Sequence, residues 1–425
     1  MKKLITILIT LLIFQLSAVL EIEKKSIILG EKITIHSDIL NEERTFLINL
    51  PENYKESQDS YPVIFQIQGS ETLFLKDCGT IRYLNQWKGA NPHIIVVNIL
   101  FTNYRRDIFP IKVPHIPNTG GSDNFISFIS SELIPYLEEN YRLSDYRIIH
   151  GQSNTGMFSI YAFLSRPDLF DACIAASPSV GQGNNFMYKI TDSLLTQNQF
   201  KENSLYITHA LDDPLSGIVG DALPGFLEIL KNKATTGLDW YYKEYSTGGH
   251  CPPISLEDGI CHIFQDWKIP QETIDAGPGV INQYCDILQK KYGIMPNLRS
   301  IFHDTAFTLM RDENYEQAHE FFSYLWKDFP EELLYAYQIG KIAAVTGLHK
   351  EEGIENLRIY ISQENDNVNP SKSAACWRLG MIYELMGEKA KAKSAYEMGL
   401  QMDVTDPYCH TALEKIKNPE LKEED

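Results

Sequence analysis

The sequence has few cysteines and no excess of basic residues. Its 425 residues include seven cysteines, and no two of them show the C-x-x-C spacing that metal sites favour. The odd number leaves at least one thiol unpaired in a monomer. Cys251 and Cys261 could form a disulfide in an oxidising compartment, but isolated structural cysteines are the simpler interpretation. The 38 basic and 56 acidic side chains give a formal net charge of −18. Because this balance argues against binding to a phosphate backbone, we expect no nucleic-acid partner.

Long hydrophobic runs are missing beyond the N-terminus. The chain begins with Lys2 and Lys3, an apolar run over residues 4–14, and Ala18 as a small residue suited to cleavage. This is the pattern of an export signal covering residues 1–18. The run is shorter than the ~20 residues that span a bilayer, which argues against the alternative of a membrane anchor. We therefore expect a periplasmic or secreted protein with no transmembrane segment after signal cleavage.

Two kinds of periodicity divide the rest of the chain. Apolar residues alternate in short runs between residues 26 and 50, which predicts antiparallel strands. Short continuous apolar runs then alternate with helical stretches, at 63–67, 94–99, 147–150, 172–176, 205–208 and 240–245. Such runs predict a parallel sheet covered by helices on both faces, so we expect an α/β domain over residues 19–270. One predicted helix, 123–140, contains Pro135, which predicts a kink near its middle.

Beyond residue 270 the pattern is helical nearly to the end. An expected linker, 271–296, contains the turn Gly277-Pro278-Gly279. Residues 297–418 carry a repeat that follows the helix-turn-helix consensus of tetratricopeptide units, most closely at Trp377, Leu379, Gly380, Tyr383, Gly387, Ala392, Tyr396 and Gly399. Weaker copies show Ala306, Ala318, Phe322 and Pro330, and then Gly340, Ala343 and Gly347. We expect an all-α repeat domain that binds a protein partner, with unrelated bundled helices as the alternative, followed by an acidic tail at 419–425.

A serine stands between a predicted strand and a predicted helix. Gly151-Gln152-Ser153 follows the apolar run at 147–150 and precedes a helical run. An α/β-hydrolase presents its nucleophile in such a turn, which is so tight that the residue two before the serine must lack a side chain. Gly151 meets that demand, whereas Thr155 stands where the G-x-S-x-G pattern has glycine and Gly156 comes one residue late. Ser153 is therefore the candidate nucleophile, and the alternative is an ordinary serine capping a helix.

Candidates for the other members of a catalytic triad follow in the hydrolase order of serine, acid and histidine. His250 comes after the last predicted strand and two glycines, so it is the candidate base. Asp212 and Asp213 follow the strand before it, and the sequence leaves open which of them orients the histidine, or whether the site is a Ser-His pair. His209 ends that strand and could line the site, whereas His262 lies in a helix and is expected to be packed or exposed.

The tetrahedral intermediate of acyl transfer also needs backbone donors for its oxyanion. One candidate is the amide of Asn154, directly after the nucleophile. The other is the amide of Ser70 or Glu71, in the loop after the strand at 63–67. Gly69 supplies either backbone freedom in this loop or an ordinary turn. The proposed chemistry needs no cofactor and no metal.

Several further segments, in order, resemble the putative esterase family, which includes enterochelin esterase-like enzymes, S-formylglutathione hydrolase and mycolyltransferase-type acyl transferases. They are Tyr61-Pro62-Val63, 102–107 before Pro110, 132–136, Gly151-Gln152-Ser153, 166–171, 176–179 and His250 before Pro252. The likeness covers about residues 50–267 and implies an α/β-hydrolase with Ser153, His250 and a carboxylate of the Asp212-Asp213 turn. Gly69-Ser70 departs from the family's Asp-Gly. The resemblance also implies that Arg106 lies near the mouth of the site, where it could contact an acidic or catechol-like group or form a structural ion pair.

The expected activity is hydrolysis of a carboxylic ester through an acyl-enzyme, by an exported α/β-hydrolase with an appended helical repeat domain. Siderophore esters, aromatic acyl esters and simple acetyl esters all suit the scaffold, so the small-molecule substrate stays open. Two alternatives remain. An acyltransferase of the same fold would differ only in the acceptor, and a decayed hydrolase would serve as a binding module whose repeats recruit a partner.

Overall fold

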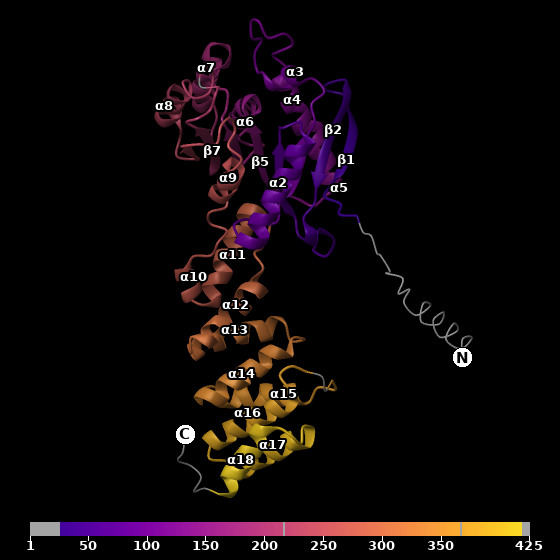
Figure 1. Cartoon of the computed structure of the whole chain (residues 1–425), viewed down its shortest axis with the longest axis vertical. Coiled ribbons are helices and arrows are strands. Elements are labelled where there is room, and N and C mark those ends of the chain that lie inside the picture. The colour runs from indigo at the N-terminus through magenta and orange to yellow at the C-terminus, as the bar shows by residue number, and fades with distance from the viewer. Residues whose placement is uncertain (1–25, 216, 366–367, 419–425) are drawn as a thin grey trace, which may run out of the picture.

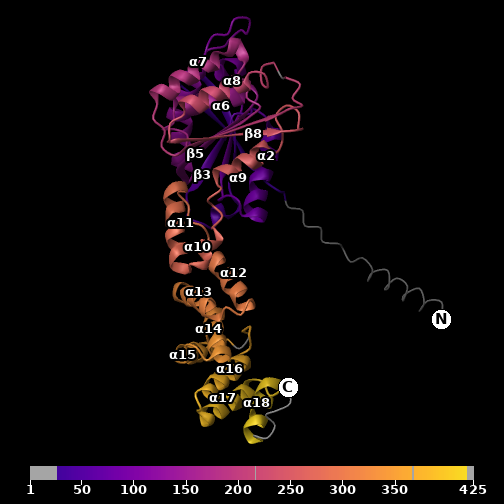
Figure 2. The ribbon, with the colours of Figure 1, turned by 90° about the vertical axis from the view of Figure 1, so that its left-hand side faces the viewer.

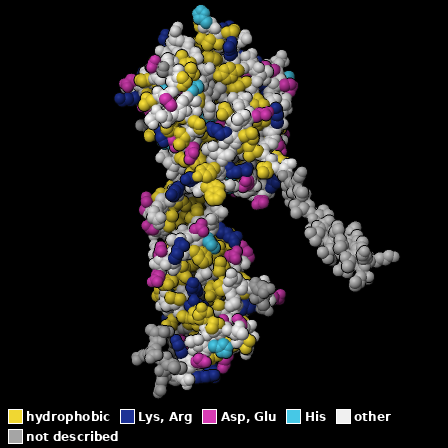
Figure 3. Space-filling view, viewed as in Figure 1, with side chains coloured by type: hydrophobic (Ala, Val, Ile, Leu, Met, Phe, Trp, Pro, Cys, Tyr) yellow, Lys and Arg dark blue, Asp and Glu magenta, His cyan; other side chains and the backbone are white. Residues whose placement is uncertain are grey.

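The computed structural model describes residues 26–215, 217–365 and 368–418, which form an α/β part and a helical arm (Figure 1). The expected signal peptide and acidic tail lie outside the described residues. Within them, none of the helices combines the length and the hydropathy that a membrane span requires. The seven cysteines all lie in the described part and are unpaired, so Cys251 and Cys261 do not form a disulfide. On the face shown in Figure 3, acidic and basic side chains are interspersed.

In the described residues, eight strands form one sheet in the order β1-β2-β4-β3-β5-β6-β7-β8. The antiparallel edge consists of β1 (Glu31–Ser37) and β2 (Glu42–Asn49), and β2 pairs antiparallel with β4 (Ile95–Ile99). The parallel strands that follow are β3 (Tyr61–Gln66), β5 (Leu143–Gln152), β6 (Ala172–Ala176), β7 (Asn203–Ala210) and β8 (Leu238–Tyr245). Every residue of β3, β4 and β6 is buried, as expected for strands covered on both faces. The α/β prediction is confirmed.

Helices cover both faces of this sheet (Figure 2). One face carries α2 (Glu71–Tyr83) and α9 (Ser255–Ile263), and the other carries α3 (Tyr104–Ile108), α4 (Ser122–Phe128), α6 (Asn154–Ser165), α7 (Gln182–Gln197) and α8 (Leu223–Lys233). The helix predicted over 123–140 is interrupted by a π-helical turn, Ile129–Leu133, before α5 (Ile134–Asn140). Pro135 has no N–H to donate to the preceding turn, which explains why the regular hydrogen-bond ladder breaks there.

The segment expected as a linker, 271–296, contains two helices, α10 (Gln271–Asp275) and α11 (Pro278–Tyr292). The end of α11 is packed into the α/β part. Tyr292 is fully buried, with its ring 4.9 Å from that of Tyr146 and 4.8 Å from that of Phe264. Its hydroxyl donates to the carboxylate of Asp266 at 2.5 Å. A bare linker does not bury an aromatic residue in a core, so this segment is part of the folded structure.

The other end of α11 belongs to the arm. Ile281 and Cys285 are fully buried in a cluster with Phe302 and Phe321 of the first two arm helices. Those helices are α12 (Leu298–Arg311) and α13 (Tyr315–Asp328). One helix therefore contributes side chains to both cores and joins the two parts without an intervening loop.

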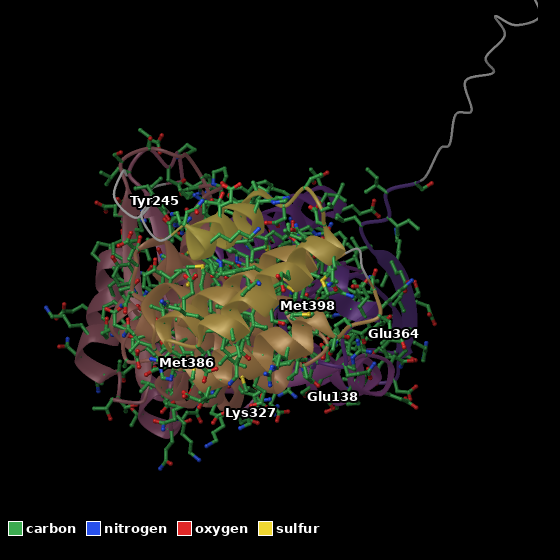
Figure 4. All side chains as sticks on the ribbon, turned by 90° about the horizontal axis from the view of Figure 1, so that it is seen from below. Glu138, Tyr245, Lys327, Glu364, Met386 and Met398 are labelled. Carbon is green, nitrogen blue, oxygen red and sulfur yellow. The ribbon has the colours of Figure 1, made fainter. Side chains whose placement is uncertain are left out.

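The rest of the arm stacks further helix pairs on the first (Figures 1 and 4). They are α14 (Leu333–Thr346) with α15 (Lys350–Ile361), and α16 (Lys372–Leu385) with α17 (Lys389–Met402), followed by α18 (Pro407–Lys417). Small residues lie where the two helices of a pair touch. A Cβ on Gly340 would lie 2.2 Å from Leu357 Cγ, and a Cβ on Gly380 would lie 2.2 Å from the Tyr396 ring. These contacts explain the recurring glycines of the sequence pattern physically.

Candidate active site

Ser153 stands in the turn between β5 and α6 in a strained backbone conformation. Its φ of 55° and ψ of −123° lie in a region that side-chain-bearing residues rarely adopt. A Cβ on Gly151 would lie 2.2 Å from the carbonyl oxygen of Thr155, so only glycine fits two residues before the serine. The Ser153 amide donates to the carbonyl of Ala176 at 2.9 Å, which ties the turn to β6. This is the geometry that the sequence predicts for a nucleophile elbow.

Thr155, the departure from the usual glycine, is built into this turn. Its hydroxyl accepts from the Gln152 amide at 2.9 Å and donates to the Gln152 carbonyl at 2.8 Å. Gly156 takes the close approach instead, because a Cβ there would lie 3.2 Å from the Gly151 carbonyl and 3.3 Å from that of Ala176. Threonine in place of the usual glycine therefore adds two hydrogen bonds across the turn.

Asp213 is the carboxylate that contacts the candidate base. Its Oδ2 lies 2.8 Å from His250 Nδ1, and its side chain is fully buried. Burial alone would raise the pKa of this carboxyl, but the hydrogen bonds from His250 and from the Leu215 amide outweigh it and lower the pKa below its ordinary value. Asp213 therefore stays ionised and can hold the imidazole in one orientation.

Asp212, the other candidate acid, has a different task. It accepts from the amide of Gly249 at 2.7 Å and from the amide of Gly248 at 3.2 Å. Both glycines have positive φ, of 63° and 141°, so the loop before His250 bends in a way that favours glycine. Asp212 thus fixes the loop that presents the histidine, while Asp213 contacts the histidine itself.

Backbone contacts bring the histidine loop to the serine turn. The amide of Cys251, next to His250, donates to Ser177 Oγ at 3.2 Å, and its thiol lies 3.8 Å from the carbonyl oxygen of Ala176. That same carbonyl accepts from the Ser153 amide. Within the described part of the chain, the hydrogen-bond partner of the Ser153 hydroxyl is Ser179 Oγ, at 3.2 Å. With Nδ1 engaged by Asp213, Nε2 of His250 is the nitrogen available to a nucleophile.

The two other histidines considered from the sequence have different surroundings. His209 is 6% exposed at the end of β7. His262 lies in α9 with its ring 5.1 Å from that of Tyr206 and 5.0 Å from that of Tyr241. Of the two expectations for His262, packed or exposed, the structure shows the packed one.

The candidate oxyanion donors lie at the N-termini of two helices. Asn154 is the first residue of α6, and Glu71 is the first residue of α2. Ser70 is the N-cap of α2, where its hydroxyl accepts from the Leu73 amide at 3.3 Å. Gly69 has a φ of 64°, and a Cβ on it would lie 2.3 Å from the Phe101 ring. Of the two interpretations of Gly69, the structure thus favours required backbone freedom.

A cavity of about 250 Å³ adjoins Asn154. It is lined by Tyr104, Arg105, Phe109, His115, Ile116, Asn154 and Gln182. Burial raises the pKa of the Tyr104 hydroxyl above its ordinary value, so it stays protonated as a hydrogen-bond donor. The cavity therefore combines aromatic side chains, a hydroxyl donor and a cationic residue next to the serine turn.

The sequence left open whether Arg106 contacts the substrate or forms a structural ion pair, and the structure shows the ion pair. The Arg106 guanidinium donates to both oxygens of Glu42, at 2.9 and 2.5 Å, and to Asp107 at 2.8 Å. The buried Arg44 also contacts Asp107, at 2.8 Å. Arg106 thus forms the structural ion pair that was its alternative, while Arg105 lines the cavity. The sequence did not single out Arg105, because the residues around it do not show which face of α3 is buried.

Comparison with known proteins agrees with this geometry. Residues 37–211 match the family model described as putative esterase. Over this stretch the chain is similar to putative esterases. The matched stretch contains Ser153 and ends one residue before Asp212, so the placement of Asp213 and His250 rests on the structure alone.

Among curated proteins, the ferri-bacillibactin esterase BesA of Bacillus subtilis (strain 168) is 31% identical to this chain over 138 residues, which are 32% of this chain and 48% of that protein. The chain thus spans about half the length of the curated relatives it matches. An IroE-like serine hydrolase from Shewanella oneidensis is similar in structure, with 26% identity, a TM-score of 0.59 and coverage of 71% of this chain and 99% of that chain. An uncharacterised protein from Capnocytophaga ochracea shares the fold over 84% of this chain and 99% of its own, with 16% identity and a TM-score of 0.63.

Proposed function

We propose that the protein is a serine-dependent carboxylic ester hydrolase, with Ser153 as nucleophile, His250 as general base and Asp213 as the acid that orients it. The observation that carries the proposal is the strained Ser153 at the strand–helix turn, beside the loop that holds the His250–Asp213 pair. Strain of this kind persists only where the surrounding structure enforces it, and it concentrates at functional sites. The similarity to a siderophore esterase and to a serine hydrolase supports the same reaction class.

In the proposed reaction the Ser153 hydroxyl turns from Ser179 to His250, and Nε2 takes its proton as Oγ attacks the ester carbonyl. The Nδ1–H bond to Asp213 fixes the tautomer in which Nε2 can accept that proton. The Asn154 amide, with that of Ser70 or Glu71, donates to the oxyanion. The imidazolium then protonates the leaving alcohol. Water, activated by the same histidine, hydrolyses the acyl-enzyme and restores the serine.

We propose a siderophore-type or aromatic acyl ester as the substrate. The cavity beside Asn154 carries the aromatic rings of Tyr104 and Phe109 together with Arg105. An aromatic acyl group with anionic or phenolic oxygens would pack against the rings and pair with the guanidinium. The relative from Bacillus subtilis is named a ferri-bacillibactin esterase, which supports the same choice.

The test is hydrolysis of an activated aryl ester, of a ferric catecholate siderophore ester and of a feruloyl ester, by the full chain and by Ser153→Ala. We expect turnover by the parent protein that falls by several orders of magnitude in the variant, with equal melting temperatures. The control is Ser179→Ala, which removes the present partner of the Ser153 hydroxyl and should retain most activity. Absence of turnover by the parent protein on all three esters would contradict the proposal and favour a binding module.

We further propose that the protein is exported and that its helical arm binds a protein partner. The signal pattern at 1–18 supports export, and the stack of helix pairs provides an extended surface of the kind that repeat proteins use for binding. Cell fractionation of the full chain beside a form lacking residues 1–18 tests the first point. Retention of both forms in the cytoplasm would contradict export.

A further inference from the structure

Two histidines and two glutamates form a compact cluster in the arm, far along the chain from the esterase site. Glu316 and His319 lie three residues apart on α13, while His349 and Glu352 lie at the start of α15. His319 Nε2 is 2.9 Å from Glu352, and His349 Nε2 is 3.1 Å from Glu316. Each helix thus offers one imidazole and one carboxylate to the other.

The donor atoms of this cluster are close enough for one ion. Ligand atoms of His319, His349 and Glu352 all lie within 4.8 Å of one another. The donors around a tetrahedral zinc ion lie roughly 3.3 Å apart, so no pair of these atoms has to approach by more than about 1.5 Å. The two imidazole rings are stacked, with centroids 3.8 Å apart and planes 5° from parallel. Binding therefore requires one ring to turn, and His349 is free to do so because its side chain is 34% exposed, against 10% for His319.

The charges around the cluster favour a cation. In the part of the chain that the structure describes, the ion pairs of Glu316 and Glu352 are those with the two histidines. The neighbouring Lys350 directs its amine to the carbonyl of Gly347, at 2.8 Å. The two carboxylates supply negative charge that a divalent ion would offset. Solvent reaches the cluster, since His319 also lines a cavity of about 480 Å³ between α11 and α13.

We propose that His319, His349 and Glu352, with Glu316 beside them, form a binding site for a first-row divalent cation, with Zn²⁺ as the preferred ion. Imidazole nitrogens suit zinc and its neighbours, whereas Ca²⁺ and Mg²⁺ prefer sites made wholly of oxygen. The ion would link α13 to α15 and so stabilise the packing of the first helix pair of the arm, α12 and α13, against the second, α14 and α15. Its effect is on the arm, and it takes no part in ester hydrolysis.

The experiment measures Zn²⁺ binding to the full chain by equilibrium dialysis, beside His319→Gln, His349→Gln and Glu352→Gln. The matched control is His410→Gln, which removes an exposed histidine on α18 whose ring contacts the Val404 carbonyl. We expect the parent protein and the control to hold one more equivalent of zinc than the first two variants. Glu352→Gln should weaken that equivalent by more than roughly 10-fold, since even partners outside the ligand set change metal affinity 10- to 100-fold.

Two further readouts separate a lost ligand from a lost fold. With a chelator present, His349→Gln and Glu352→Gln should melt like the parent protein, because both side chains are partly exposed. The Co²⁺ form of the parent protein should show the visible absorption of a tetrahedral site, and His349→Gln should lose it. Equal zinc stoichiometry and affinity in the parent protein, His319→Gln and His349→Gln, or no zinc bound by the parent protein, would overturn the proposal.

Discussion

Asp212 and Asp213 are adjacent, equally charged residues for which the structure gives opposite expectations. Asp213 contacts His250 Nδ1 at 2.8 Å, whereas Asp212 accepts from the amides of Gly248 and Gly249. The two isosteric substitutions, Asp213→Asn and Asp212→Asn, remove the same charge one residue apart. Each is a control for the other, since both changes remove one carboxylate charge but only Asp213 contacts the histidine.

The contacts set the expected magnitudes. An asparagine at position 213 can donate its amide N–H to Nδ1, which favours the tautomer whose Nε2 already carries a proton and cannot take another from Ser153. In a serine triad this exchange lowers kcat by about 10⁴-fold, or about 5.5 kcal/mol. An asparagine at position 212 keeps one acceptor oxygen and so loses one of two hydrogen bonds to the loop. One charge-assisted bond contributes about 1.5–3 kcal/mol, so the loss in kcat should stay within about 100-fold.

The assay is steady-state hydrolysis of an activated aryl ester, with thermal melting of each variant recorded beforehand. We expect kcat of Asp213→Asn to fall at least about 100-fold below that of Asp212→Asn, with KM little changed in both. Similar losses in the two variants, or a larger loss in Asp212→Asn, would refute the assignment of Asp213 as the acid.

Three other predictions concern stability. Thr155→Val should lower the free energy of unfolding by about 2 kcal/mol in urea titrations, because two partly buried hydrogen bonds to the Gln152 backbone are lost. Thr155→Ser should stay within about 1 kcal/mol. Tyr292→Ala should lower the free energy of unfolding by about 3–5 kcal/mol in thermal melts, because the ring is fully buried. The control is Ile287→Ala on the same helix, whose side chain is 62% exposed and whose loss should cost less than about 0.5 kcal/mol. Equal melting of the two variants would mean that α11 is not part of the α/β core. Since folding lowers the pKa of Asp213, its stabilisation is present above the ordinary aspartate range and is lost as the pH falls through the folded value. The stability difference from Asp213→Asn should thus hold from neutral pH to about pH 4 and shrink below it, and a difference that vanishes above pH 5 would contradict this.

Local sterics made the sheet and the serine turn predictable from sequence. Continuous apolar runs between helices can form only a sheet covered on both faces, and Gly151 is required because any side chain there would meet the carbonyl of Thr155. The order of Asp212 and Asp213 relative to His250 was also visible. The sequence could not show which of the two carboxylates faces the histidine. That depends on the direction of each side chain in the turn, and residue spacing carries no information on side-chain direction.

The orientation of Arg105 and Arg106 and the packing of α11 could not be predicted from the sequence, because contacts with distant segments decide both. Adjacent residues on a helix point about 100° apart, so either Arg105 or Arg106 could have faced the cavity. The choice is made by Glu42 on β2, which pairs with Arg106 and leaves Arg105 beside the site.

The role of α11 was hidden for the same reason. Its amphipathic pattern predicts a helix but not which partner covers each part of it. Tyr292 is buried against Tyr146 and Phe264 of the α/β part, and Ile281 is buried against Phe302 of the arm. A fragment ending at residue 270 would expose the aromatic surface that Tyr292 covers, whereas one ending at residue 296 would keep it. The α/β part and the arm therefore meet within α11, because its first turns pack in the arm and its last turn completes the core that supports the sheet.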